Sequence, residues 1–115
     1  MTSKFYGGAL IILVALGAFV SVPMQNAQPS PAGNVRDAIV EAKQGVDHGK
    51  QGHADVLVTH AENSLHFAER GGQKHAFERR DEASARAIEH GKAGHADVAT
   101  EHAEAALTHL TEVKF

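Results

Sequence analysis

The sequence lacks several residue types that would support specific chemistries. Its 115 residues include no cysteine and no tryptophan, and only one tyrosine and five phenylalanines. Without cysteine the chain forms no disulfide and offers no thiolate to a metal ion or a substrate. Acidic and basic residues are interspersed at a formal net charge of −3, so no basic stripe is available for nucleic acid. No serine lies in a recognisable nucleophile motif, and we expect a protein that is not an enzyme.

The longest apolar stretch lies at the N-terminus. Residues Phe5–Val22 carry no charge, follow Lys4 and precede a segment rich in Pro, Gln, Asn and Ser. This layout is typical of a secretory signal peptide, but 18 residues also reach the lower limit for a membrane-spanning helix. We predict that residues 1–27 are either a signal peptide or an inner-membrane anchor formed by residues 5–22. The rest of the chain is exported in both cases, and only an uncleaved segment would contact a membrane.

The remaining residues have the apolar periodicity of helices, and no alternating Val, Ile or Thr run predicts a strand. Residues 28–33 are a predicted flexible linker, after which Asn34 is expected to cap a first helix that ends at Gly49 and Gly52. The four predicted helices span roughly residues 34–48, 53–70, 75–92 and 96–113. Because short glycine turns make consecutive helices antiparallel, residues 34–115 are predicted to form an all-α, up-down-up-down four-helix bundle, as a monomer.

One segment of the chain occurs twice. Asp47–Arg70 aligns with Glu89–Glu112 at an offset of 42 residues without a gap, and twelve of the 24 aligned positions are identical. Both copies contain H-G-K-x-G-H-A-D-V, followed by H-A-E seven residues after the second histidine. The bundle is therefore predicted to be a duplicated helical hairpin, and the duplication preserves histidines together with their spacing.

The bundle topology predicts where the nine histidines lie. The first and third turns share one end of such a bundle, so four histidines that flank them should gather there: His48, His53, His90 and His95. His60 and His102 are expected about 10 Å further along their helices. His66, His75 and His109 fall toward the opposite end.

Metal binding is the chemistry that this pattern favours. Histidines seven residues apart on one helix lie too far apart to share an ion, so each site must be completed from another helix, across a turn or by a carboxylate. Several separate sites are therefore expected. The candidate carboxylates are Asp47, Asp55, Glu62, Glu89, Asp97 and Glu104. Imidazole and carboxylate without thiolate suit Cu(II), Ni(II) and Zn(II), and the affinity order places Cu(II) first.

These motifs resemble the small metal-binding protein family, histidine-rich periplasmic four-helix bundles of nitrifying and related bacteria. The resemblance covers roughly Val35 to Leu110 and is carried by AIVEAKQGVDHGK, HGKQGHADVLVTHAENSLHFAE and HAFERRDEASARAIEHGKAGHADVATEHAEAALTHL. It implies a periplasmic protein that binds Cu(II) and other divalent metals and takes part in copper handling or detoxification. Transferred position by position, it implies eight metal ligands: His48, His53, His60, His66, His90, His95, His102 and His109.

Three functions remain open from the sequence. The first is a metal buffer or scavenger, and the second is a haem-binding bundle that uses histidines such as His60 and His102. The third is a ligand-free helical interaction module, which would respond to pH through its histidines. A Soret band would favour haem. A melting temperature that chelators leave unchanged would favour the ligand-free module.

Overall fold

The computed structural model describes residues 28–72 and 78–114, and these form helices without any strand, with short turns between the first and second helices and between the third and fourth. The helices are α1 (Pro31–Lys50), α2 (Ala54–Arg70), α3 (Glu78–Lys92) and α4 (Ala96–Thr111). The all-α four-helix bundle predicted from the sequence is confirmed. The proposed signal or anchor segment, residues 1–27, lies outside the described residues, as does the predicted start of the third helix at His75.

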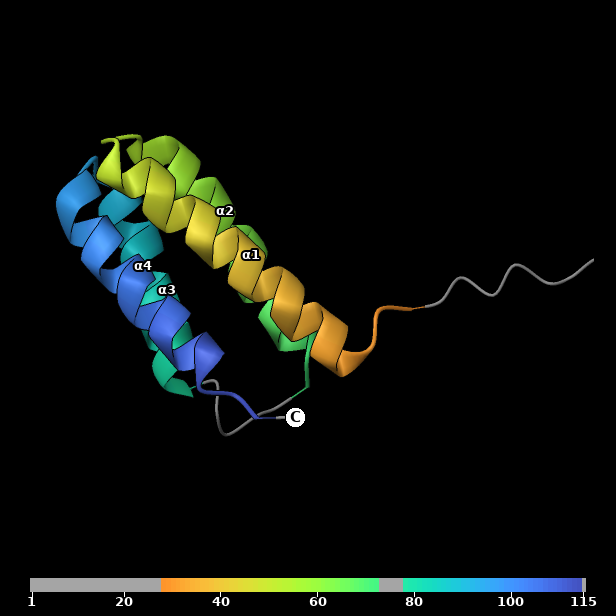
Figure 1. Ribbon diagram of the computed structural model, residues 1–115. Helices are drawn as coiled ribbons and strands as arrows, with labels where there is room; N and C mark the ends of the chain where they lie inside the picture. The colour runs from red at the N-terminus through yellow and green to blue at the C-terminus, as the bar shows by residue number, and fades with distance from the viewer. Residues whose placement is uncertain (1–27, 73–77, 115) are drawn as a thin grey trace, which may run out of the picture.

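Each helix packs mainly against two neighbours around the bundle, and α2 also contacts α4 across it. α1 packs on α2 and α4, and α3 packs on the same two helices, which places α1 and α3 on a diagonal. The α1–α2 turn and the α3–α4 turn lie at the same end of the bundle (Figure 1). We call this the turn end. In the described part of the chain, no helix combines the length and the apolar character needed to cross a membrane.

The start of α1 differs from the sequence prediction. Ser30 is the N-cap residue, and its hydroxyl accepts a hydrogen bond of 3.1 Å from the backbone N–H of Gly33. Pro31 occupies the first helical position, where its missing N–H costs nothing. Asn34 lies inside α1, buried, and its side-chain amide donates a 3.2 Å hydrogen bond to the Arg70 carbonyl at the end of α2. The prediction that Asn34 caps α1 is therefore wrong.

The core consists mainly of small and β-branched side chains. Most of its buried apolar residues form two clusters, one toward each end of the bundle. Their members are Val35, Ala38, Ala42, Ala68 and Leu110 in one cluster, and Val46, Leu57, Ala61, Ala87, Ala99 and Ala103 in the other. Because alanine side chains are short, the helices must approach closely to exclude water from between them.

Two glycines set the closest approach at the turn end. A Cβ atom on Gly49 would lie 2.1 Å from the Thr100 hydroxyl oxygen, and one on Gly91 would lie 2.4 Å from a Val58 methyl carbon. Thr100 and Val58 occupy equivalent positions in the two repeats, so each hairpin packs its glycine against the other hairpin. Gly49 was predicted to end the first helix, yet it lies within α1, where its role is this close contact.

The first turn of α3 places a charged side chain in the interior. The Arg80 side chain is almost completely buried, and its Nε donates a 2.9 Å hydrogen bond to the Asp81 carboxylate. Burial lowers the pKa of Arg80, and the hydrogen bond and charge of Asp81 oppose that change. This arginine belongs to the packing of α3 at the end of the bundle away from the turns.

Candidate metal-binding sites

The turn after α1 brings two histidines together. The backbone N–H of His53 donates to the His48 carbonyl at 3.0 Å, and that of Gly52 donates to the Gly49 carbonyl at 2.9 Å. These two nested bonds are the Schellman motif that ends many helices, and it requires a residue with positive φ. Gly52 supplies it with a φ of +80°. The same turn that ends α1 therefore places His48 and His53 side by side.

The turn after α3 repeats this arrangement. His95 donates its N–H to the His90 carbonyl at 2.9 Å, Gly94 donates to Gly91 at 2.9 Å, and Gly94 has a φ of +78°. The spacing H-G-K-x-G-H is therefore explained by local structure. The second glycine of the motif adopts the left-handed conformation. The two histidines are the residues joined by the Schellman hydrogen bond that spans more of the sequence.

The two histidines that flank each turn form a turn pair, and in the first pair, His48 and His53, the ring nitrogens are close enough to share an ion. The Nδ1 atoms of His48 and His53 lie 3.5 Å apart. With metal–nitrogen bonds of about 2.05 Å, this separation corresponds to an N–metal–N angle of roughly 115–120°, close to tetrahedral. Their ring centroids lie 5.8 Å apart, and those of His90 and His95 lie 6.0 Å apart at the same interplanar angle of 39°.

A third histidine joins each pair from the following helix. The His60 ring stacks on His48 with centroids 5.4 Å apart, and the His102 ring stacks on His90 at the same distance. We call His48, His53 and His60 the first triad, and the equivalent residues His90, His95 and His102 the second triad. Both turns lie at the turn end, as predicted, but in the described residues every contact between histidine rings stays within one hairpin.

The third ring of each triad does not yet converge with the other two. Across residues 28–72 and 78–114, no three histidine, aspartate or glutamate side chains are placed to hold one ion as they stand. In the first triad the reason is visible, since the rings of His60 and His48 lie face to face at an interplanar angle of 9°. A metal ion on a turn pair would therefore gain a third nitrogen ligand only after rotation of side-chain torsions.

A carboxylate that was not predicted from the sequence contacts the first triad. Glu41 of α1 accepts a hydrogen bond from the Nδ1 atom of His60 at 2.9 Å and another from the Asn63 amide at 3.2 Å. His60 and Glu41 are both largely buried, with side-chain exposures of 19% and 22%. Glu41 precedes His48 by seven residues, two turns of the same helix, and this spacing is the signal that could have identified it.

The glutamates of the two H-A-E motifs have a different role. Glu104 forms an ion pair with Lys50 at 2.8 Å, and Glu62 forms one with Lys92 at 2.8 Å. The Glu104 carboxylate raises the pKa of Lys50, through its hydrogen bond and then its charge, so this lysine stays cationic. Each pair joins the lysine of one H-G-K motif to the other hairpin. In this structure the repeated Lys and Glu residues therefore tie the hairpins together.

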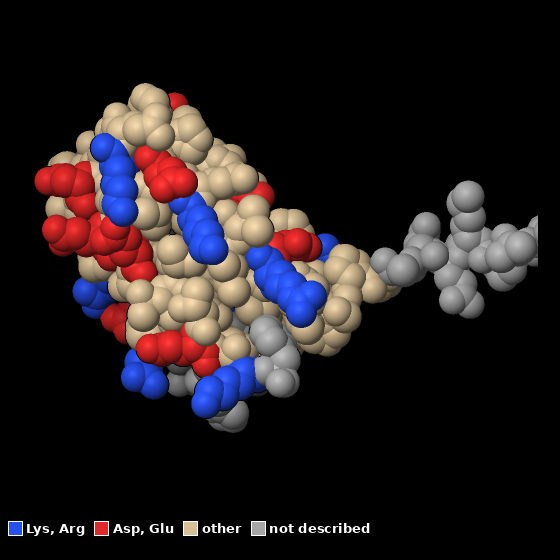
Figure 2. All heavy atoms as spheres, viewed as in Figure 1, with Lys and Arg blue, Asp and Glu red and all other residues tan. Residues whose placement is uncertain are grey.

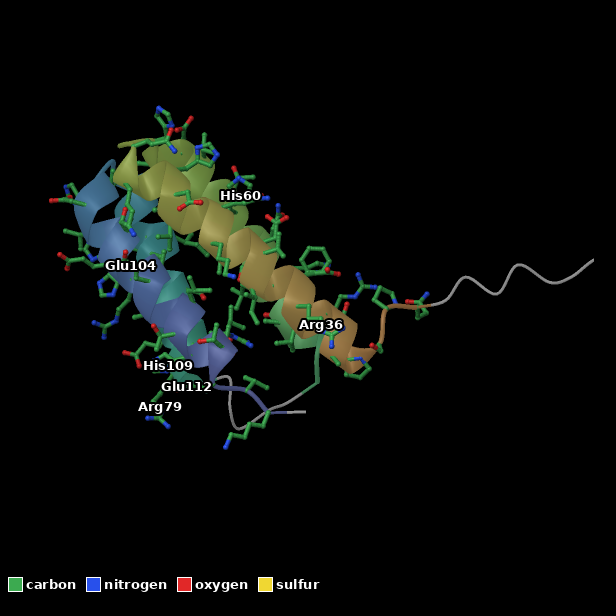
Figure 3. All side chains as sticks on the ribbon, viewed as in Figure 1. Arg36, His60, Arg79, Glu104, His109 and Glu112 are labelled. Carbon is green, nitrogen blue, oxygen red and sulfur yellow. The ribbon has the colours of Figure 1, made fainter. Side chains whose placement is uncertain are left out.

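The other predicted ligands lie apart from the triads. His66 is exposed on α2, with its ring 6.2 Å from that of Phe67. His109 lies 3.6 Å from the Glu112 carboxylate and shares a surface pocket with Arg79. Figure 3 shows these last three residues together at the end of the bundle opposite the turns, away from His60. His75, which the sequence also placed toward that end, lies outside the described residues.

The surface charges agree with the composition. Figure 2 shows acidic and basic side chains interspersed over the face in view, without a continuous basic patch on that face. Such a surface gives no electrostatic support for binding a polyanion.

Comparison with known proteins identifies the family. No curated protein matched the chain. The family described as "Small metal-binding protein" matches residues 7–113, which is nearly the whole sequence and includes both hairpins and both triads. The chain therefore belongs to the small metal-binding protein family.

Proposed function

We propose that this protein binds Cu(II), and less tightly Ni(II) and Zn(II), through the two histidine triads at the turn end. The observation that carries this proposal is the recurrence of one histidine arrangement in both hairpins. The turn pairs have nearly equal ring separations, and the stacked third rings have equal separations. The two copies differ at twelve of their 24 aligned positions and yet have the same three histidines with the same contacts.

The ligand set supports divalent transition metals. Neutral imidazole binds Cu(II), Ni(II) and Zn(II), and for a given nitrogen site the affinity order places Cu(II) ahead of the other two. The separation of the His48 and His53 nitrogens fits two bonds to one ion, as calculated above. The third histidine of each triad would complete such a site after side-chain torsions in the triad rotate. His53 and His95 precede their helices in a non-helical conformation, so the separation expected of histidines seven residues apart within one helix does not keep them from sharing an ion with His60 and His102.

Buffering or scavenging of the metal is the role that fits these positions best, as part of metal homeostasis or detoxification. His53 and His95 are exposed at the tips of their turns, where an ion enters and leaves without passing through a channel. A catalytic metal would instead need an enclosed substrate site beside an open coordination position. The apolar segment at residues 5–22 supports export, and we place the protein in the periplasm.

The haem alternative receives little support from the interior of the bundle. The cavity between the four helices is lined by alanine, serine and glycine and has room for about one water molecule. His60 and His102 contact the turn histidines of their own hairpins rather than facing each other across a large pocket.

Calorimetric titration with Cu(II), Ni(II) and Zn(II) tests the proposed function. The key variant replaces the six triad histidines by alanine, and the matched control replaces His66 and His109. We expect the control to retain the tightest Cu(II) sites and the six-histidine variant to lose them, while circular dichroism shows that both remain helical. Equal losses of affinity in the two variants would contradict the assignment of the sites to the triads.

A further inference from the structure

The two triads consist of equivalent histidines, but the residues around them differ. In the first triad, the Nδ1 atom of His60 lies 2.9 Å from a Glu41 oxygen, and that same oxygen also accepts a hydrogen bond from Asn63. The equivalent positions in the second hairpin, 42 residues later, are Ala83 and Ala105. Alanine has no group that could bond to an imidazole. In the described residues His102 accordingly has no side-chain hydrogen bond like that of His60.

A third difference lies next to the same histidine. Gly45 of α1 faces His60, and a Cβ atom added to this glycine would lie 3.3 Å from the His60 Cβ atom. The equivalent residue in the second hairpin is Ala87, which carries that Cβ atom. The absence of a side chain at Gly45 lets α1 approach α2 closely beside His60, which brings Glu41 within reach of the ring.

The hydrogen bond to Glu41 determines which nitrogen of His60 is available. A carboxylate only accepts hydrogen bonds, so Nδ1 of His60 carries the proton that it donates. In the neutral ring the lone pair then belongs to Nε2, on the side of the ring away from Glu41. A carboxylate on the back of a ligating histidine fixes its tautomer and orientation and increases its basicity. Loss of such a partner typically costs about 10–100-fold in metal affinity.

From these differences we infer that the two triads are unequal, and that the first triad binds metal first because Glu41 prepares His60 as a ligand. Glu41 is a positioning residue, since it acts through His60 and does not itself touch the ion. This inference rests on the proposed function. It adds an order of filling, so that the protein has one tighter and one weaker site.

The experiment compares single-triad variants of the full chain. One variant keeps the first triad and has alanine in place of the second, and the other has the reverse. Titration with Cu(II) should give an affinity for the first triad about 10–100-fold higher than for the second. If neither variant binds Cu(II) more tightly than free imidazole does, the proposed function itself is wrong. Equal affinities would overturn only the inference.

Substitutions at Glu41, made in the variant that keeps the first triad, test the cause. Glu41→Ala should lower the Cu(II) affinity of the first triad about 10–100-fold, to that of the second triad. Glu41→Gln keeps an oxygen acceptor for His60 and should lose less. Asp37→Ala is the matched control, because it removes the same charge from an exposed position one helical turn earlier in α1 and should change nothing. An unchanged or higher affinity in Glu41→Ala would overturn the inference.

Nitrogen-15 NMR of the metal-free protein separates positioning from a general effect on the fold. His60 should be in the tautomer with the proton on Nδ1, and Glu41→Ala should abolish that preference. His102, which has Ala83 in place of the glutamate, should show no change. If the His60 tautomer is the same with and without the Glu41 carboxylate, this residue does not prepare the ligand.

Discussion

At the scale of single residues, the glycines within α1 and α3 decide how closely the hairpins approach. Gly49 lies against Thr100 and Leu57, and its counterpart Gly91 lies against Val58. An alanine in an open helical position usually stabilises a helix relative to glycine. At Gly49 and Gly91 an added Cβ atom would overlap neighbouring side chains. The packing of one hairpin on the other therefore requires glycine at these positions.

Replacement of this glycine should therefore destabilise the bundle. We expect Gly49→Ala to lower the free energy of unfolding by about 1–3 kcal/mol, because its Cβ atom would overlap Thr100 and Leu57 and force the helices apart. Urea denaturation measures this change. Adding Thr100→Ala should recover part of the loss, since it removes the nearest atom. A Gly49→Ala protein as stable as the wild type would contradict the packing described.

Sequence reasoning succeeded at the residue scale where the information was local. The two H-G-K-x-G-H motifs correctly placed the histidines of each turn at one end of the bundle, whereas ligation by the eight predicted histidines stays a prediction. Glu41 was missed because its partner His60 lies on another helix. Asn34 was misassigned for the same reason, since its contact with the Arg70 carbonyl depends on the packing of α1 against the end of α2.

At the scale of elements, the turn is the unit that forms each histidine pair. The Schellman hydrogen bonds end the helix and join the backbones of the two histidines. In many Schellman motifs the side chains at these two positions are apolar and contact each other, and here both side chains are imidazoles. The geometry of each histidine pair therefore depends on the left-handed conformation of one glycine in each turn.

A substitution in the turn should affect stability and metal binding together. An alanine at Gly52 meets no atom within 4 Å but must adopt a φ of +80°, which costs about 1–2 kcal/mol. Relaxation of the turn would separate His48 from His53 and weaken Cu(II) binding at the first triad. Gly72→Ala is the matched control, with a φ of +74° and equally open surroundings at the other end of the bundle.

Denaturation and titration of both variants distinguish the two effects. Gly52→Ala and Gly72→Ala should lose similar stability, and only Gly52→Ala should lose affinity for Cu(II). Equal affinity in the two variants would show that the turn does not control the site.

The elements themselves were predictable because the apolar periodicity and the glycine turns are properties of contiguous sequence. The prediction placed the start of α2 to within one residue, since Gly52 lies just before its N-cap residue, His53. The start of α1 was set three residues too late, at Asn34 rather than Pro31, because the capping hydroxyl of Ser30 lies within what looked like a linker. The close approach of the helices at Gly49 could not be predicted, since it depends on side chains of α2 and α4.

At the scale of the whole molecule, the duplication gives the bundle an approximate two-fold relation between its hairpins. The packing contact between Gly49 and Thr100 has its equivalent between Gly91 and Val58. The ion pair between Lys50 and Glu104 likewise has its equivalent between Lys92 and Glu62. These contacts account for the repeated Gly, Lys and Glu as residues that join the hairpins. These packing contacts do not involve the repeated histidines, and the metal binding that we propose accounts for them.

Metal binding at the triads should stabilise the folded protein by mass action. An ion at about 100 times its dissociation constant adds about 2.7 kcal/mol if only the native state binds it. The unfolded chain keeps its histidines and binds some metal, which reduces the gain. For a bundle of this size we expect Cu(II) to raise the melting temperature by about 5–10 °C and a chelator to reverse the rise.

The most direct test of the metal-binding account is the melting temperature with and without Cu(II), measured for the wild type and for the variant in which alanine replaces the six triad histidines. We expect a rise for the wild type and little or none for the variant. The control without His66 and His109 should behave as the wild type. An equal rise in all three proteins would mean that copper stabilises the bundle from elsewhere, and it would contradict the assignment of the sites to the two triads.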